Sequence, residues 1–507
     1  MARTFDNLSD PVFQYATERP DARALIDGPS VLTYRQLADL VGRASVYLTE
    51  RGIGVGDRVG VCLTNSIDHI ILVLALLRVG ATVAELHYAS SKPLDPALVQ
   101  RFGLARLFLE ANAAAPGGAE TIRLDTAWRP GLARHAGDHR AAPTADELHV
   151  ITSSSGSTGL PKSVLKTQRM VLDRHAVFLD SIGGALSAAG EPPAMIVMAS
   201  LALSPFFRRL LGQFAAGGPV VLLPEFAHPI DLVKAIAAWD SATFAATANM
   251  CRAFIAAAPP DAILFPGVRA LISLGTPLYP EEKRAMIRRV TPNFYDVYGA
   301  SGMGTITVLV PAEVEAMAAS VGRAAPGIEI EIVDAHGGPC AAGTIGRVRC
   351  RGKTSAGAFV TTAEPSETER FADGWYYPGE FGYLDGDGYL FLKGRVSDVV
   401  RRSGIELFPT EIEEALASHP GVREAAVVGV PSAPHGHELV AVVVKDGEPS
   451  HNDIAQHCRA RLSPEKWPDR IFYAAALPMT SGGKPDRVQV RTMVLEEIAR
   501  RQKAGQR

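Results

Sequence analysis

The sequence predicts an α/β fold: a large N-terminal domain of parallel-sheet subdomains plus a β-barrel-like subdomain, followed by a small α+β C-terminal domain. Strand-like and helix-like patterns alternate up to about residue 322, as they do where helices cover a parallel sheet. After about residue 322, three short segments at 328–333, 348–351 and 389–392 follow a period of two, which indicates antiparallel or barrel-like strands. The last block, from about residue 397 onward, has its own helices and strands and is long enough for a small domain.

The predicted elements follow one another along the chain in this order. Apolar residues at helical spacing predict helices over 32–48 and 68–78, and apolar runs predict strands at 58–63, 81–86, 220–223, 242–246 and 270–273. Period-two segments predict strands at 328–333, 348–351 and 389–392, with Asp385-Gly386 as a hairpin turn before the last of them. The final block predicts a helix over 410–418, strands over 425–430 and 439–444, a helix over 454–462 and a basic tail.

The bulk composition is that of an ordinary globular protein. Of 507 residues, 51 are basic and 54 acidic, and this net charge of -3 favours neither nucleic acid nor an anionic membrane as partner. The five cysteines form no C-x-x-C pair, which fits reduced thiols in a cytoplasmic protein. The N-terminus lacks the apolar segment of a signal peptide, and the most apolar run, Ile70 to Leu77, is too short to span a bilayer. We therefore expect a cytoplasmic protein with no nucleic-acid and no membrane partner.

A Ser/Gly-rich loop at residues 152–162 is the most informative stretch of the chain. It consists of Thr152, Ser153, Ser154, Ser155, Gly156, Ser157, Thr158, Gly159, Leu160, Pro161 and Lys162. Glycines let backbone N–H groups approach phosphate oxygens, hydroxyls donate hydrogen bonds, and a lysine supplies a mobile positive charge. The loop is not a Walker P-loop, because it does not match G-x-x-x-x-G-K-[ST], and a flexible Ser/Gly linker is the alternative. We expect it to bind the phosphates of a nucleotide.

The loop resembles the phosphate-binding loop of the adenylate-forming (ANL) superfamily, which includes acyl-CoA synthetases, adenylation domains and luciferase-like ligases. Segments 56–61, 321–327 and 343–348 are also similar to family segments, in the family's order, so the resemblance covers nearly the whole chain. It implies an N-terminal AMP-binding domain over 1–396 and a small mobile C-terminal domain over 397–507.

Tyr298, Gly299 and Ser301 occupy the place of the family's Tyr-Gly-x-Thr-Glu motif. The resemblance implies that the Tyr298 ring stacks on adenine and that the Ser301 hydroxyl contacts a phosphate. Gly302 stands where the family has a Glu that holds Mg²⁺, so water or a different carboxylate holds the ion, or the site works differently. A plain Gly-rich loop is the alternative. The resemblance implies ATP and Mg²⁺ as cofactors, and we assign no protein ligand to the metal.

Other motifs of the family are matched further along the chain. Glu380 stands where the family's Asp accepts hydrogen bonds from both ribose hydroxyls, and Arg395 matches an Arg that contacts ribose or phosphate. Ser397 occupies the hinge position, where the family usually has Asp or Lys. The segment from Pro478 to Lys484 matches the family's Pro-x-Thr-x-x-Gly-Lys loop, which makes Lys484 the candidate catalytic residue. Its ammonium would stabilise charge that builds between the attacking carboxylate and the α-phosphate, and an exposed tail lysine is the alternative.

The acid pocket is defined more weakly. The segment 201–207 contains no Asp for an α-ammonium group, which argues against a standard α-amino acid as substrate. By resemblance, the pocket is lined by Phe206, Asn249, Gly275, Thr276 and Pro277. Phe206 with its small neighbours suits a flat aromatic or short cyclic acid. Arg208 and Arg209 are candidates for meeting a second anionic group, or are simply solvated on their helix.

The sequence thus predicts an ATP-dependent ligase with a biosynthetic role. It activates a small-molecule carboxylic acid, aryl or small cyclic, as an acyl-AMP, and transfers the acyl group to the thiol of CoA or a carrier protein. One alternative is an amide synthetase that uses an amine as acceptor. The other is a catalytically silent nucleotide-binding homologue, which Gly302 and Ser397 favour slightly and the intact Lys162 and Lys484 oppose.

Overall fold

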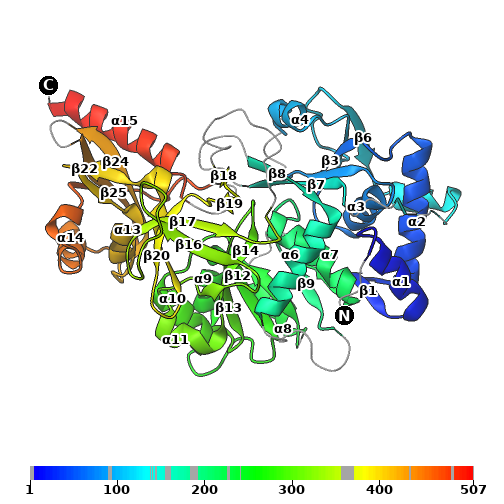
Figure 1. Ribbon diagram of the computed structural model, residues 1–507, viewed down its shortest axis with the longest axis horizontal. Coiled ribbons are helices and arrows are strands. Elements are labelled where there is room, and N and C mark those ends of the chain that lie inside the picture. The colour runs from blue at the N-terminus through cyan, green and yellow to red at the C-terminus, as the bar shows by residue number, and fades with distance from the viewer. Residues whose placement is uncertain are drawn as a thin grey trace.

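The computed structural model describes residues 5–88, 94–137, 139, 141–142, 146–154, 162–182, 192–224, 229–239, 241–355, 370–432, 436–480 and 485–505. The predicted fold class is confirmed: the protein is α/β, with two sheets of mostly parallel strands, an antiparallel sheet and a C-terminal domain with sheets of its own. Figure 1 shows the C-terminal residues, yellow to red, at one end of the molecule and the blue N-terminal residues at the other.

The largest sheet has nine strands in the order β15-β14-β13-β12-β11-β9-β10-β1-β2. Its strands are β1 (Arg23–Asp27), β2 (Ser30–Thr33), β9 (Met195–Val197), β10 (Val220–Leu222), β11 (Thr243–Ala246), β12 (Ala270–Leu274), β13 (Phe294–Ala300), β14 (Gly304–Leu309) and β15 (Arg323–Ala324). The six strands from β13 to β1 are parallel, whereas β14, β15 and β2 pair antiparallel at the two edges. Three of the predicted apolar runs are therefore confirmed as β10, β11 and β12.

A second sheet of six strands has the order β6-β5-β3-β4-β7-β8. Its strands are β3 (Arg58–Cys62), β4 (Thr82–Glu85), β5 (Arg106–Glu110), β6 (Glu120–Leu124), β7 (Leu148–Ser154) and β8 (Lys162–Thr167). All neighbours are parallel except β7 and β8, which form an antiparallel hairpin at one edge. Two short helices, α4 (Pro96–Phe102) and α5 (Trp128–Gly131), lie in its connections.

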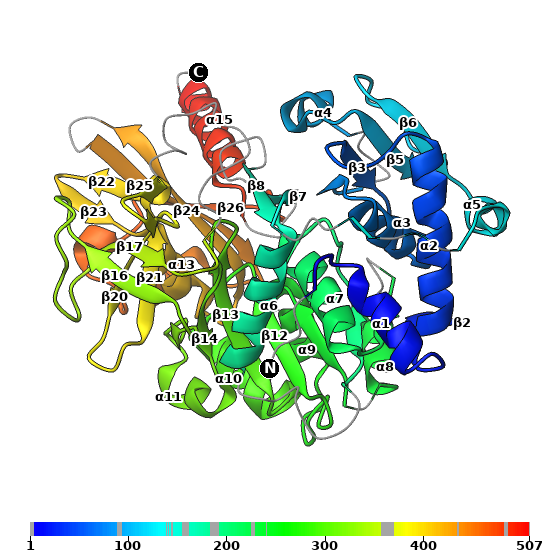
Figure 2. The same ribbon diagram turned by 45° about the vertical axis from the view of Figure 1, so that its right-hand side comes forward.

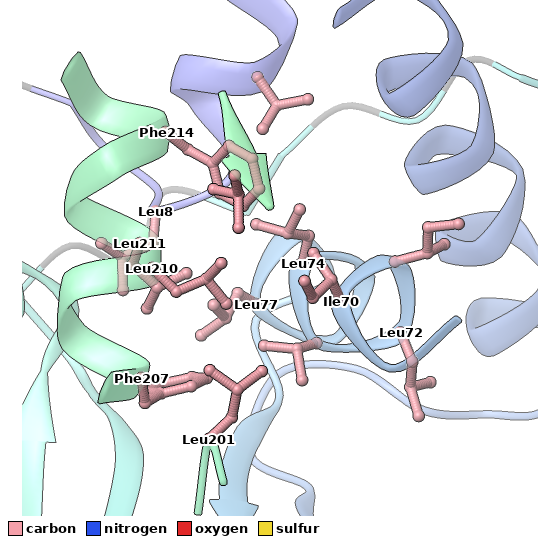
Figure 3. Packing of buried hydrophobic residues seen from close by; sticks show 14 of the residues in the cluster. Leu8, Ile70, Leu72, Leu74, Leu77, Leu201, Phe207, Leu210, Leu211 and Phe214 are labelled. Carbon is pink, nitrogen blue, oxygen red and sulfur yellow. The ribbon is translucent and has the colours of Figure 1, made fainter. Parts of the chain in front are cut away.

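Helices between these two sheets form the largest apolar core. They are α1 (Asp10–Glu18), α2 (Tyr34–Glu50), α3 (Ile67–Arg78), α6 (Gln168–Ser181) and α7 (Ser204–Ala216). Nearly every position of α3 is buried, which explains why this helix is apolar on all sides. Figure 3 shows Leu74 and Leu77 of α3 facing Phe207, Leu210 and Phe214 of α7. The apolar face of α7 is thus fixed by the core.

Helix α6 connects the two parallel sheets. It begins directly after β8, where the Thr167 side chain caps the helix by accepting a hydrogen bond from the Met170 amide. It packs on β7 and β8 of the second sheet, on β14 of the first sheet and on α7. Figures 1 and 2 both show α6 and α7 side by side in the centre of the molecule.

The remaining helices of the nine-stranded sheet cover its other face. They are α8 (Pro229–Ala237), α9 (Ala248–Ala257), α10 (Pro280–Ala285) and α11 (Val314–Met317). Their apolar side chains share a second core cluster with strands of that sheet, and Phe244, Phe254 and Phe265 pack there edge to face.

The predicted β-barrel-like subdomain is an antiparallel sheet of six strands. They are β16 (Glu329–Val333), β17 (Gly346–Arg351), β18 (Phe371–Ala372), β19 (Trp375–Tyr376), β20 (Glu380–Leu384) and β21 (Leu390–Arg395). Within the described part of the chain the order β18-β19-β17-β20-β21, with β16 beside β17, is an open path and not a closed ring. The predicted Asp385 turn joins β20 to β21, and its carboxylate accepts hydrogen bonds from the amides of Asp387 and Tyr389.

The C-terminal domain begins with a two-stranded sheet and continues with a three-stranded one. Its elements are β22 (Val400–Arg402), β23 (Ile405–Leu407), α13 (Pro409–Ala417), β24 (Val422–Ser432), β25 (Gly436–Lys445), α14 (His451–Arg459), β26 (Arg470–Tyr473) and α15 (Arg487–Gly505). Two core clusters are made entirely of residues from this domain, one on each face of the long β24–β25 hairpin. The predicted helices and strands of the block are confirmed.

Two local expectations differ from the structure. Leu32 and Thr33, predicted as the start of a helix, lie in β2, and the helix begins at Tyr34 because Thr33 and Gln36 form a capping box. The basic tail is the long helix α15, whose Val490 and Val494 are buried against the domain core. Within the described residues, no helix is long and apolar enough to cross a membrane.

Candidate functional site

The ends of four neighbouring parallel strands define one edge of the nine-stranded sheet. Strands β9, β11, β12 and β13 are parallel, so the segments that follow them leave from the same edge. Ligands of open α/β sheets bind outside this carboxyl edge. Phe206 follows β9, Asn249 follows β11, residues 275–277 follow β12, and residues 298–300 end β13, with Ser301 directly after it. Sequence positions that are far apart therefore meet in one region of the molecule.

The β7–β8 hairpin carries the predicted phosphate loop. Thr152, Ser153 and Ser154 end β7, Lys162 begins β8, and Ser154 pairs with Lys162 across the hairpin. Ser155, Gly156, Ser157, Thr158 and Gly159 lie outside the described residues. The two strands bring the ends of the loop together, as a phosphate-wrapping turn requires.

Tyr298 and Glu380 are joined by a hydrogen bond although 82 residues separate them. The Tyr298 hydroxyl donates to Oε2 of Glu380 at 2.7 Å, and Glu380 faces Arg395 across the β20–β21 pair. Burial, reinforced by the neighbouring Glu380 carboxylate, raises the pKa of Tyr298 well above its usual value, so the phenol stays a donor. Three predicted nucleotide-binding residues are thus brought together, and Glu380 keeps a second carboxylate oxygen for another donor.

The backbone after Tyr298 turns tightly and is held by an arginine. A Cβ atom on Gly299 would lie 2.4 Å from the carbonyl oxygen of Gly304, so only glycine fits there. Arg174 of α6 donates to the carbonyls of Ser301, Gly302 and Thr354 at 3.0, 2.9 and 3.0 Å. No sequence signal pointed to Arg174, because its role arises from a helix that follows the phosphate loop and reaches the Tyr298 turn.

Gly302 has a steric partner in the antiparallel sheet. A Cβ atom at this position would lie 2.4 Å from Cε2 of Tyr376, whose ring is buried at the end of β19. Its φ angle is not among the positive ones, so the backbone itself tolerates a side chain here. The Tyr376 ring therefore occupies the space that a glutamate side chain at position 302 would need.

The predicted acid-pocket residues differ in their surroundings. Phe206 is buried within the core around α3 and α7, with 3% of its surface exposed. Asn249 is exposed and accepts a 3.2 Å hydrogen bond from Arg252, which is also paired with Glu282. Gly275 has a φ of +93°, which turns the chain out of β12 toward Thr276 and the exposed Pro277.

The predicted hinge lies in a short 3₁₀ turn from Val396 to Asp398. The Ser397 hydroxyl donates to Oδ1 of Asp398 at 2.8 Å. Arg487, at the start of α15, pairs with Asp398 at 2.9 Å and with Glu413 of α13 through two hydrogen bonds. Lys484 lies outside the described residues, three positions before Arg487. Arg487 thus ties the segment after the candidate catalytic lysine to the hinge.

Comparison with known proteins decides the family. A model of the AMP-binding enzyme family matches residues 12–359, and the model of its C-terminal domain matches residues 411–484. The chain belongs to this family of AMP-binding enzymes. Together with the naming of its relatives as ligases, this makes the protein an adenylate-forming ligase.

Relatives of this AMP-binding enzyme match over nearly their full length. It is 27% identical to an oxalate–CoA ligase of Arabidopsis thaliana, with 97% of this chain and 99% of the relative covered. It is equally 27% identical to the fatty acid–[acyl-carrier-protein] ligase ScoC of Streptomyces coeruleorubidus, with 96% of each covered.

Solved structures of AMP-binding enzymes share the fold. The o-succinylbenzoate CoA synthetase MenE of Bacillus subtilis, in complex with ATP and magnesium, has a TM-score of 0.82 at 22% identity and covers 94% of this chain and 98% of its own. The amide bond synthetase McbA of Marinactinospora thermotolerans has a TM-score of 0.81 at 24% identity and covers 96% and 99%. At these identities the likeness concerns the fold alone.

Proposed function

We propose that the protein activates a small carboxylic acid with Mg·ATP and transfers the acyl group to the thiol of CoA or of a carrier protein. A carboxylate oxygen attacks the α-phosphorus, the bond to pyrophosphate breaks, and acyl-AMP remains. The thiolate sulfur then attacks the acyl carbon, and AMP leaves. The family match to both domains is the observation that carries this proposal. The named thiol acceptors of the relatives, CoA and acyl-carrier protein, support the second step.

The contacts of the predicted nucleotide-binding residues support the adenylation step of this proposal. Glu380 and Arg395 suit the ribose, with one carboxylate oxygen held by Tyr298 and the other available to a hydroxyl. The Ser/Gly loop between β7 and β8 suits the phosphates. Gly302 brings no carboxylate to its turn, and the described residues contain no group of three or more potential metal ligands. Mg²⁺ fits such a site as an ion carried by ATP oxygens and water, since it usually keeps several waters.

The small domain supplies the catalytic cation in this proposal. Lys484 stabilises the charge that develops at the α-phosphate while residues 397–507 are closed over the site. Rotation about Ser397 then withdraws Lys484 before thiol attack. An acid without an α-ammonium group fits residues 201–207, and an aryl or small cyclic acid stays a prediction that rests on Phe206.

A second candidate function is amide synthesis. McbA, which shares the fold, is named an amide bond synthetase, so an amine is the alternative acceptor to the thiol. The adenylation step is the same in both cases, so the acceptor alone separates them. Mass spectrometry of the products formed with CoA, a phosphopantetheinyl carrier protein and simple amines identifies the acceptor.

Exchange of labelled pyrophosphate into ATP, measured with a panel of acids, tests the adenylation step. Lys484→Ala should lower the exchange rate by orders of magnitude in a folded protein. Arg500→Ala is a matched control, because Arg500 is an exposed cation of α15 with 78% of its side chain accessible. Equal rates of pyrophosphate exchange in the wild type and in Lys484→Ala would show that Lys484 has no catalytic role. No exchange with any acid would favour a silent nucleotide-binding homologue.

A further inference from the structure

Positively charged side chains gather where α6 meets α7. Lys166 comes from β8, Arg174 from α6, and Arg208 and Arg209 from α7. Lys166, Arg174 and Arg209 are buried, with exposed fractions of 3%, 2% and 4%. Burying a cation is costly unless an anion or several acceptors compensate it. The cluster therefore needs a physical explanation.

One edge of α7 brings this cluster together. Ser204, Arg208 and Gly212 are spaced four residues apart and so lie on the same side of the helix. Lys166 Nζ donates to Ser204 Oγ at 2.8 Å at one end of this edge. At the other end, a Cβ atom on Gly212 would lie 2.2 Å from the ring of His175. Gly212 thus permits the close approach of α6 and α7, with Arg208 between the two contacts.

Arg208 extends from this edge to the turn that follows Tyr298. Its Nη1 atom lies 3.1 Å from where a Cβ atom of Gly304 would be, and Cδ of Arg174 is equally close to that point. Gly304, with a φ of +88°, closes the same turn whose carbonyls bind Arg174. The Arg208 guanidinium is therefore beside the region where the adenylate would form.

The arginines of the cluster differ in how they are compensated. Arg174 is satisfied by three backbone carbonyls. Arg209 lies 4.4 Å over the ring of Phe178, and its Nη1 atom has no hydrogen-bond partner among the described residues. Arg208 makes no hydrogen bond or ion pair within the described part of the chain. Of the three guanidinium groups, that of Arg208 is the one with five donors left for a ligand.

The positive charges of the cluster repel one another. Burial lowers the pKa of Arg208 to about 10, and burial together with Arg208 lowers the pKa of Arg174 and of Arg209 to about 9. No carboxylate of the described residues contributes to these shifts. Burial, with Arg209 and Arg208 nearby, lowers the pKa of His175 to about 3, so this imidazole is neutral at physiological pH. An anion would relieve the mutual repulsion of the arginines.

Resting on the function proposed above, we propose that the acid substrate carries a second anionic group, a carboxylate or a similar oxyanion, which pairs with Arg208 beside the turn of Gly304. A guanidinium matches a carboxylate by two parallel hydrogen bonds, which gives both affinity and orientation. Arg208 belongs to the helix that follows β9, where the sequence places the acid, whereas the phosphate loop follows β7. The second anion is therefore assigned to the acid, and the KM for ATP tests the alternative that Arg208 pairs with a phosphate.

Pairs of acids that differ only in the second charge test this proposal. Suitable pairs are succinate and succinamate, glutarate and glutaramate, and isophthalate and 3-carbamoylbenzoate. Calorimetry measures the binding of each acid to the full-length protein saturated with α,β-methylene-ATP, which does not release pyrophosphate. The wild type should bind the dianionic member of at least one pair roughly ten- to hundredfold more tightly than its amide, the effect expected of a charge-assisted hydrogen-bonded pair.

Arg208→Met should bring the ratio of the two dissociation constants, amide over dianion, close to one, while the KM for ATP stays unchanged. Arg169→Met is the matched control, because Arg169 is also an arginine of α6–α7 but is 38% exposed and paired with Asp146 at 2.5 Å. It should keep the wild-type ratio. If Arg208→Met does not fold, as judged by circular dichroism, Arg208→Lys replaces it and should reduce the ratio in part, since it keeps the charge but not the planar fork.

Three results would overturn the proposal: equal binding of both members in every pair, no binding of any acid, or an unchanged ratio in Arg208→Met. An increased KM for ATP in that variant, with the ratio preserved, would assign Arg208 to the nucleotide and also overturn it. Pyrophosphate exchange separates this question from the ligase activity. If pyrophosphate exchange is equally fast with monoanionic acids, the proposed ligase activity holds and the anion site is contradicted. If the wild type prefers dianionic acids in the binding assay and Arg208→Met does not, but no acid supports exchange, the anion site holds and the ligase activity is contradicted.

Discussion

The hydroxyl of Tyr298 lies 2.7 Å from Oε2 of Glu380, and this hydrogen bond joins β13 of the nine-stranded sheet to β20 of the antiparallel sheet. It holds a candidate ribose-binding carboxylate in place from a different sheet. Loss of the donor in Tyr298→Phe should cost about 1.5–3 kcal/mol of unfolding free energy, as for a hydrogen bond to a charged group, and should raise the KM for ATP. Urea unfolding and pyrophosphate exchange measure the two effects.

Glu380→Gln provides the complementary variant. If Tyr298 and Glu380 act as a pair, the double variant should lose less unfolding free energy than the two single variants lose together. Additive losses would show that the two side chains act independently. Tyr295→Phe is a control tyrosine of the same strand, and it should leave the KM for ATP unchanged.

Arg174→Met should destabilise the protein by roughly 3–5 kcal/mol, because it leaves the carbonyls of Ser301, Gly302 and Thr354 without their donor. The kcat for pyrophosphate exchange should fall as well, since the turn after Tyr298 loses its support. Thermal and urea unfolding check the first effect. A loss below about 1 kcal/mol, the range of exposed arginines, would mean that water replaces the guanidinium at no cost.

Gly302→Ala should be destabilising by about 1–3 kcal/mol, because its Cβ atom meets the ring of Tyr376. Removal of the ring in Tyr376→Ala should make the same glycine substitution nearly neutral, so a double-mutant cycle gives a favourable coupling. Gly386→Ala is the matched control, since nothing lies within 4 Å of its Cβ position. The steric explanation for the missing glutamate fails if Gly302→Ala costs the same with and without the ring.

Arg487→Met should cost about 3–5 kcal/mol in the stability of the C-terminal domain, because Glu413, with 8% of its side chain exposed, loses its charge partner. Arg470→Met removes an exposed pair of the same domain and should cost less than about 1 kcal/mol. Hydrogen exchange of α13 and β24 detects the difference. Equal protection in both variants would exclude a structural role of the Arg487 pair.

The buried thiols should resist alkylation. Burial raises the pKa of Cys62 and Cys350 to about 12 and that of Cys458 to about 11. Cys340 is partly exposed, so iodoacetamide should modify it first at pH 8, as peptide mapping would show. Unfolded thiols ionise near pH 9 and the buried ones only above it, so the unfolded state binds fewer protons there, and stability should fall as the pH rises above 9.

The sequence predicted the architecture well because its helix and strand patterns are strong. The period-two run at residues 329–333 and the all-apolar helix α3 have few alternative interpretations. The boundary of α2 was wrong by two residues, since the capping box of Thr33 outweighs the apolar Leu32. Helix α15 was missed, because Val490 and Val494 find their apolar contacts only on strands far earlier in the chain.

The candidate site was predicted only in part. Tyr298, Glu380 and Arg395 could be named because the short motifs around them resemble family motifs, and the structure brings them together. Two contacts could not be predicted from single positions. Arg174 donates hydrogen bonds to the turn after Tyr298, and the ring of Tyr376 lies beside Gly302. Both depend on contacts between elements that the chain separates by more than seventy residues, which no sequence window contains.

The position of helix α6 limits which residues can be changed to alter the acid specificity of the enzyme. The helix leaves the strand that closes the phosphate loop, and its Arg174 supports the turn that carries Tyr298. Substitution of Arg174 would therefore disturb nucleotide and acid handling together. The Ser204–Arg208 edge of α7 is anchored by Phe207, Leu210 and Phe214, which pack in the core that α7 shares with α3. Libraries aimed at new acids should vary this edge and leave α6 intact.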